Sequence, residues 1–100
     1  MKLSIDTSKR EKISIKIDER EFESIATSDK SQMLLLFIEK CIQKSGKMLT
    51  DISEISVMTG PGSFTGLRVG VAVAQALGWS LGVPVNGNEF NQKKYIDIHY

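Results

Sequence analysis

The eleven residues GPGSFTGLRVG, at positions 60–70, constrain the fold of this chain more than any other segment. They follow a short apolar run at residues 55–58, and such a run before turn residues is typical of a strand buried on both faces. Gly60 and Gly62 can adopt backbone φ and ψ angles that other residues avoid, and Pro61 between them has a fixed φ angle. An apolar stretch then continues to Leu81. The segment therefore predicts a strand, a tight loop and a helix in succession.

The predicted helix after the loop has clear ends and a distinctive inner face. Ser63 or Thr65 can cap its first amides, and Gly82 can end it. Small residues at every fourth position predict a shallow ridge that packs on the sheet or on another helix, flanked by larger apolar residues. The ridge consists of Gly66, Gly70, Ala74, Gly78 and Gly82, and its flanks of Val69, Val73 and Leu77.

The spacing of the loop differs from that of the common nucleotide-binding loops. A Walker loop needs a later glycine followed by Lys and Ser or Thr, and no such run is present. A Rossmann fingerprint that starts at Gly60 would need a glycine where Thr65 stands. The glycines are therefore interpreted as a structural connection, and the alternative of an anion at the helix N-terminus is left open.

The rest of the chain supplies the other elements of a mixed sheet. Three stretches alternate apolar and polar residues and are separated by hairpin-sized polar breaks, which predicts antiparallel neighbours at residues 3–7, 13–17 and 22–26. A helix is expected over residues 31–45, and a last strand over residues 83–85. This order predicts an α/β, ribonuclease H-like fold, as in one lobe of an actin-like ATPase, with a five-stranded mixed sheet and two main helices.

Both predicted helices carry residues outside their core stripes that are typical of protein interfaces. Aromatic residues, Met and Arg are enriched at interface cores. The alternative is that scattered exposed apolar residues have no function. The candidate interface residues are Met33, Leu36, Phe37, Lys40, Arg68, Ala72, Gln75 and Trp79.

GPGSFTGLRVG, together with LSIDTS at residues 3–8, resembles the TsaB family, and the similarity runs in order over residues 1–86. The resemblance implies the actin-like ASKHA fold and a non-catalytic dimerisation subunit of the bacterial machinery that makes threonylcarbamoyladenosine in tRNA. It implies a TsaD-type catalytic partner and an ATPase subunit, with tRNA contacted only indirectly. ATP or ADP would belong to the assembled complex, and no cofactor to this chain alone. The motif loop comprises Gly60, Pro61, Gly62, Ser63, Phe64, Thr65 and Gly66.

The chain departs from the family in two places. Lys30, Ser31 and Gln32 stand where family members usually carry His-Ser-Glu. Residues 1–87 are expected to correspond to the N-terminal lobe, with residues 88–100 as a divergent tail and no second lobe, as in a fragment or in a naturally short member. Because actin-like lobes normally pack on each other, an uncovered side predicts self-association as a homodimer.

Catalytic groups are sparse in the sequence. Asp6, at the end of the first predicted strand, stands where ribonuclease H-like nucleases place a metal-binding acid. Two-metal chemistry needs several converging carboxylates, however, and only the remote Glu39 is available. We expect Asp6 to bond the following turn or the glycine loop. The candidates on the nucleotide side of an actin-like lobe are Asp6, Thr7 and Ser8.

The remaining composition agrees with a scaffold. His99 is the only histidine, and Cys41, the only cysteine, lies on an apolar helix stripe, so we predict a core thiol, no metal site and no catalytic residue. A net charge of +1 gives no pull toward nucleic acid, and no apolar run predicts a membrane span, so a cytoplasmic location is expected. The alternatives are an orphan nucleotide-binding lobe, a degenerate member that only self-associates, and a glycoprotease, an activity once claimed for relatives of the family.

Overall fold

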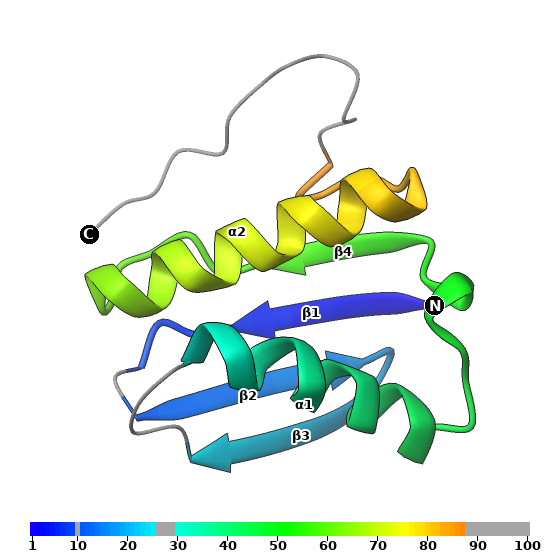
Figure 1. Cartoon of the computed structure of the whole chain (residues 1–100), viewed down its shortest axis with the longest axis horizontal. Coiled ribbons are helices and arrows are strands. Elements are labelled where there is room, and N and C mark those ends of the chain that lie inside the picture. Colours follow the sequence, from blue (N-terminus) through cyan, green and yellow to red (C-terminus); the bar gives the residue numbers. More distant parts are fainter. Residues whose placement is uncertain (10, 26–29, 88–100) are drawn as a thin grey trace.

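The computed structural model describes residues 1–9, 11–25 and 30–87, which form one layer of sheet and one layer of helices (Figure 1). The strands are β1 (Lys2–Asp6), β2 (Lys12–Ile17), β3 (Arg20–Ile25) and β4 (Glu54–Val57). The helices are α1 (Lys30–Lys44) and α2 (Phe64–Leu81), with a short 3-10 helix at Leu49–Asp51. The sheet has the order β3-β2-β1-β4. β1 and β3 are antiparallel to β2, which confirms the predicted antiparallel neighbours, and β4 is parallel to β1.

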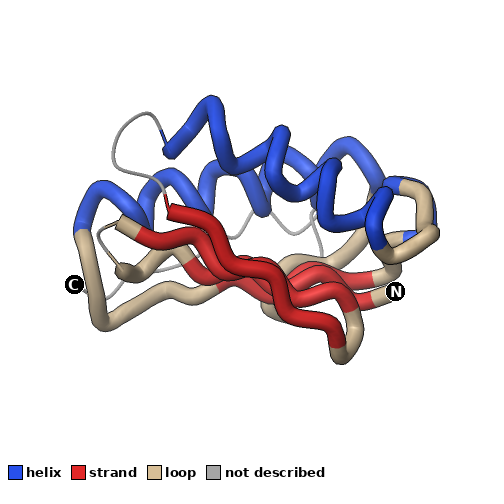
Figure 2. Tube along the Cα trace, turned by 90° about the horizontal axis from the view of Figure 1, so that it is seen from below, coloured by secondary structure: helices blue, strands red, loops and turns tan. Residues whose placement is uncertain are grey.

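Alternating residues give the sheet one apolar face and one polar face. Leu3 and Ile5 of β1 lie opposite Ile17 and Ile15 of β2, and all four are at most 2% exposed in a core shared with both helices. Ser4, between the two β1 core residues, is only half-buried. Figure 2 shows both helices on the same side of the sheet. The apolar face is therefore the helix-covered face, and the polar face is open.

The expectation that the strand before the glycine loop is buried on both faces is wrong. Ile55 and Val57 are buried, but Ser56 is half-buried and Met58 is 42% exposed. The short apolar run is the inward half of an ordinary one-sided strand, because helices cover only one face of the sheet.

The expected fifth strand is reduced to an isolated parallel bridge between Val85 and Ile55, so the sheet has four strands in the part of the chain described. Asn86 and Gly87 adopt positive φ angles of 50° and 79° and turn the chain away. The Asn86 side chain stands in for the backbone of the next strand residue, since it accepts a hydrogen bond from the Val57 N–H and donates one to the Val57 C=O. The tail predicted at residues 88–100 lies outside the described residues.

α2 begins and ends where the sequence predicts. Ser63 is its N-cap, and the Ser63 hydroxyl accepts from the Gly66 amide at 3.4 Å. Gly82 ends it in a left-handed conformation with φ of 67°. The ridge of small residues is confirmed as an inner face, because four of its five members are buried: Gly66, Gly70, Ala74 and Gly78.

Candidate functional site

The glycine loop and the end of β1 form a corner, where the carboxyl ends of β1 and β4 lie side by side. The Ser63 amide donates to the Ser8 carbonyl at 2.7 Å, and the Met58 amide donates to the Ile5 carbonyl at 2.9 Å. A Cβ atom added at Gly62 would lie 2.6 Å from the Ser8 carbonyl oxygen. Gly62 is therefore needed for the close approach of the two segments.

The three nucleotide-side candidates are bonded within the protein. Asp6 Oδ1 accepts from the Ser8 amide at 2.9 Å and from the Ser8 hydroxyl at 2.6 Å, which confirms the predicted turn. The Thr7 hydroxyl is buried and donates to the Gly66 carbonyl of α2. A Cβ atom at Gly70 would overlap this hydroxyl. The corner thus ties the first strand to the first turns of α2.

Three amides at the start of α2 have partners within the protein. The Ser63 amide donates to Ser8, the Gly66 amide donates to the Ser63 hydroxyl, and the Leu67 amide donates to the Ser63 carbonyl. An anion at this helix end would compete with these contacts. Residues 1–9, 11–25 and 30–87 contain no cluster of three or more His, Cys, Asp or Glu side chains placed to hold a metal ion.

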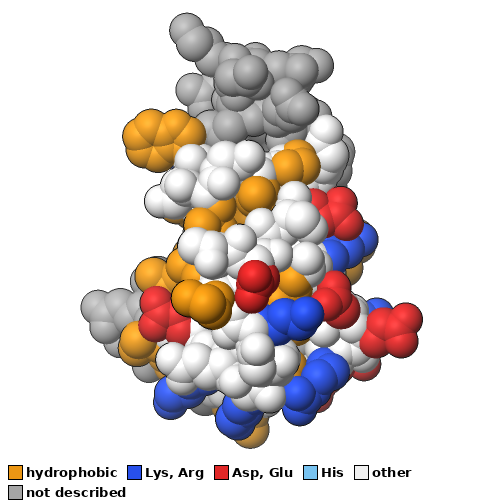
Figure 3. Space-filling model, turned by 90° about the vertical axis from the view of Figure 1, so that its right-hand side faces the viewer, with side chains coloured by type: hydrophobic (Ala, Val, Ile, Leu, Met, Phe, Trp, Pro, Cys, Tyr) orange, Lys and Arg blue, Asp and Glu red, His pale blue; other side chains and the backbone are white. Residues whose placement is uncertain are grey.

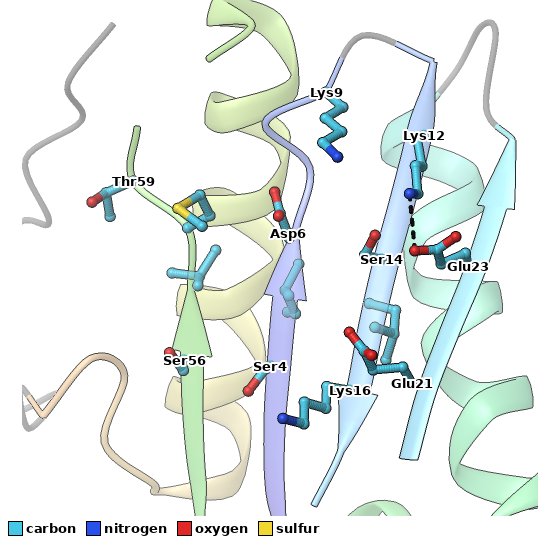
Figure 4. Close-up of a pocket in the computed structure, with 14 residues that line it drawn as sticks. Ser4, Asp6, Lys9, Lys12, Ser14, Lys16, Glu21, Glu23, Ser56 and Thr59 are labelled. Atoms are coloured by element: carbon cyan, nitrogen blue, oxygen red, sulfur yellow. Dashed lines mark ion pairs between the residues drawn. The ribbon is translucent and has the colours of Figure 1, made fainter. Parts of the chain in front are cut away.

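A hollow of about 430 Å³ lies over the open face of the sheet and was not predicted from the sequence (Figure 4). The Lys12 ammonium pairs with the Glu23 carboxylate at 2.9 Å across β2 and β3. Charges of both signs line the hollow, so it presents no field of a single sign to a ligand. Its charged residues are Asp6, Lys9, Lys12, Lys16, Glu21 and Glu23. The alternation of charged and serine residues on the strands was the signal for this polar face.

Among the described residues, four of the seven exposed large apolar side chains lie on the two helices, and the other three are Ile25, Met48 and Met58. Leu36 of α1 is 61% exposed and Trp79 of α2 is 72% exposed. Figure 3 shows large apolar groups on the helix side, while acidic and basic side chains gather toward the sheet side. We call the exposed residues of this side the helix flank: Met33, Leu35, Leu36 and Lys40 of α1, with Arg68, Ala72 and Trp79 of α2.

Three candidate positions differ from the sequence analysis. Phe37 and Gln75 are half-buried, and Phe37 packs against the core, so neither is a fully exposed flank residue. Leu35 is 41% exposed and was missed. Its signal was the run of three consecutive leucines, because a helical period of 3.6 residues cannot turn all three toward one core.

Cys41 is confirmed as a core thiol and is 1% exposed. Burial raises the pKa of the Cys41 thiol to about 11, against a smaller lowering effect of the nearby Lys44 charge. The thiol is therefore protonated at neutral pH and unsuited to nucleophilic attack.

No helix in the described part of the chain combines the length and the apolar character needed to cross a bilayer.

Comparisons with known proteins relate this fold to tRNA modification. Residues 23–87 match the family model described as TsaD, tRNA N6-adenosine threonylcarbamoyltransferase. The chain is 39% identical to the tRNA threonylcarbamoyladenosine biosynthesis protein TsaB of Escherichia coli K12 over 57 residues, which are 57% of this chain and 25% of that protein. It is 38% identical to the tRNA N6-adenosine threonylcarbamoyltransferase of Geotalea uraniireducens over 63 residues, which are 63% of this chain and 18% of that protein.

Among solved structures, a Pseudomonas aeruginosa protein described as similar to the peptidase YeaZ superposes with a TM-score of 0.72. The two chains are 28% identical, and the match covers 84% of this chain and 40% of the other. The chain thus spans a quarter or less of the length of the two curated relatives and under half of the solved one.

Proposed function

The chain belongs to the family that the tRNA N6-adenosine threonylcarbamoyltransferase model describes and is TsaB-like within it, and from this premise we propose that it is a non-catalytic docking subunit of the machinery that makes threonylcarbamoyladenosine in tRNA. It pairs through the helix flank with a TsaD-type catalytic subunit or with a second copy of itself. The observation that carries this proposal is the exposure of Leu36 on α1 and Trp79 on α2, two large apolar side chains on the helices that cover one face of the sheet.

The chemistry of the described residues supports a scaffold over an enzyme. Asp6 is held by Ser8, and the Cys41 thiol is buried and protonated. The hydroxyl of Thr7 is buried in the corner. Asp6, Thr7 and Cys41 are thus engaged in holding the fold, and under this proposal catalysis belongs to the partner.

Nucleotide binding is assigned to the assembled complex, with its ATPase subunit, and tRNA contact to the partners. The Ser63 amide already donates to Ser8 and the Gly66 amide to the Ser63 hydroxyl, which supports a corner without a nucleotide of its own. An orphan nucleotide-binding lobe, the alternative, predicts that ATP raises the melting temperature of the wild type but not of Gly62→Val or Asp6→Ala. The docking proposal predicts little change with ATP in any of them.

Light scattering after size-exclusion chromatography tests the helix flank. We expect a dimer for the wild-type chain and a monomer for Leu36→Glu combined with Trp79→Glu, because two buried charges oppose an apolar interface. Met58→Glu is the matched control, since Met58 is an exposed apolar residue on the open face of the sheet. A dimer that survives the double substitution would refute this surface.

Co-elution tests the catalytic partner separately. We expect the wild-type chain to elute with a purified TsaD-type subunit and the Leu36→Glu, Trp79→Glu variant to elute alone. A full-length TsaB protein serves as the positive control. If that control binds and this chain does not, the partner proposal is wrong even where the homodimer stands.

A further inference from the structure

Asn86 and Gly87 combine a reactive dipeptide with an unusual structural position at the edge of β4. We propose that Asn86–Gly87 is a deamidation site whose reaction is restrained by pairing with β4 and, once completed, releases residues 84–86 from the sheet. Both residues are exposed to water, and a Cβ atom at Gly87 would meet nothing within 4 Å. Water can therefore reach this dipeptide, and no neighbouring group crowds Gly87.

Four hydrogen bonds hold this segment on β4. The Val57 amide donates to Asn86 Oδ1 at 2.8 Å, and Asn86 Nδ2 donates to the Val57 carbonyl at 3.0 Å. The Asn86 amide donates to the Ile55 carbonyl at 2.8 Å, and the Ile55 amide donates to the Pro84 carbonyl at 3.0 Å. The side chain of Asn86 thus replaces the backbone of a further strand.

The chemistry requires only water as co-reactant. The Gly87 nitrogen attacks Cγ of Asn86 and loses its proton, the new C–N bond closes a five-membered succinimide, and the Cγ–Nδ2 bond breaks to release ammonia. Water then opens the ring at either carbonyl and gives aspartate or isoaspartate. A glycine after the asparagine favours ring closure because no side chain hinders the attacking nitrogen.

Folding restrains the first step. The side chain must leave Val57 before Cγ can turn toward the Gly87 nitrogen, so both side-chain hydrogen bonds must open. Two bonds of ordinary net strength correspond to a slowing of about tenfold or more relative to the unfolded chain.

The product cannot restore the pairing. In aspartate an oxygen replaces Nδ2 and faces the Val57 carbonyl, so two acceptors oppose each other where a hydrogen bond stood. In isoaspartate the peptide bond to Gly87 is made through Cγ of the former side chain, so the backbone is also lengthened and shifted. The outer edge of β4 then presents unpaired backbone groups, which can pair with another strand.

Mass spectrometry of the intact chain tests the restraint on the reaction. We expect incubation in mildly alkaline buffer to convert Asn86 at least about tenfold more slowly in the folded chain than in urea, with each rate divided by that of a free peptide of residues 84–90 in the same buffer. Asn91 precedes Gln92, whose side chain hinders ring closure, and serves as an internal reference in urea. Equal ratios in the folded chain and in urea would overturn the restraint, and an Asn86 that reacts no faster than Asn91 in urea would overturn the site.

Hydrogen exchange tests the release. We expect Asn86→Asp to speed exchange of the Ile55 amide at least about fivefold, because this amide donates to Pro84, while amides between β1 and β2 keep their rates. Asn88→Asp makes the same charge change two residues later and should leave the Ile55 amide unchanged. An Ile55 amide that keeps its protection in Asn86→Asp would overturn the release.

Discussion

The inner and outer faces of α1 and α2 use similar residues under opposite constraints. Leu34 is fully buried whereas Leu36, two residues later, is 61% exposed. On α2, Gly70 is buried against Thr7 whereas Ala72, also two residues later, is exposed. Every residue of the inner face is fixed by what it touches inside the molecule. Large apolar side chains of the outer face, such as Leu36 and Trp79, instead stay mostly exposed to solvent, and the proposed function assigns this exposed area to a partner.

The leucine pair gives the sharpest test of the comparison. We expect Leu34→Ala to lower the free energy of unfolding by about 3 kcal/mol, because it removes a fully buried side chain and leaves a cavity. Leu36→Ala should change that free energy by less than about 0.5 kcal/mol. Urea denaturation followed by circular dichroism measures both. A similar loss in the two variants would mean that Leu36 already packs within one chain.

The second test compares added volume on the two faces of α2. Gly70→Val should lower the free energy of unfolding by about 2–3 kcal/mol, because its side chain would overlap the Thr7 hydroxyl and disturb the bond to Gly66. Ala72→Val adds two methyl groups on the exposed side, so only a helix-propensity cost of about 0.6 kcal/mol is expected. Thermal melts of both variants measure the difference, and equal losses would contradict a tight inner ridge.

Most elements of the fold could be predicted from local sequence patterns. The alternation of apolar and polar residues predicted the three antiparallel strands, and the capping residues Ser63 and Gly82 predicted both ends of α2. The prediction of a last strand was wrong for a specific reason. The Asn86 side chain makes the hydrogen bonds to the Val57 N–H and C=O that the backbone of a strand would make, and no periodicity in the sequence encodes this replacement. The two-sided burial of β4 failed because a short apolar run cannot report how many layers cover a sheet.

The sequence predicted on which side of the helices the exposed apolar residues lie, but it predicted less well which residues are exposed there. The helical period put Leu36 and Trp79 outside the core stripe, and both are exposed. Phe37 is half-buried because it packs against the core from the border of the stripe, and its place in an interface stays a prediction. The identity of a partner could not follow from periodicity, since an exposed side chain shows only that the molecule itself does not cover it.

Cys41 tests the inner face of α1 through pH. Because burial raises the pKa of its thiol to about 11, the unfolded chain releases this proton at lower pH than the folded chain. The wild type should therefore lose stability as pH rises from about 8.5 to about 11, by on the order of 2 kcal/mol more than Cys41→Ala. Chemical denaturation across this range measures the difference between the two profiles, which cancels the titration of other groups. Parallel profiles would mean that the thiol ionises freely in the folded chain.

Apart from the control substitutions, substitution of Asp6 has the smallest expected effect on the free energy of unfolding, and it tests whether the corner, like the inner face, serves only to hold the fold. Asp6→Asn keeps an acceptor for the Ser8 amide but loses the charge that strengthens both bonds, so the free energy of unfolding should fall by about 1 kcal/mol. The homodimer measured by light scattering should persist, as expected for an internal contact. If Asp6→Asn were as stable as the wild type and instead abolished a thermal shift caused by ATP, the corner would be a ligand site, and the most specific motif of the chain would serve binding as well as structure.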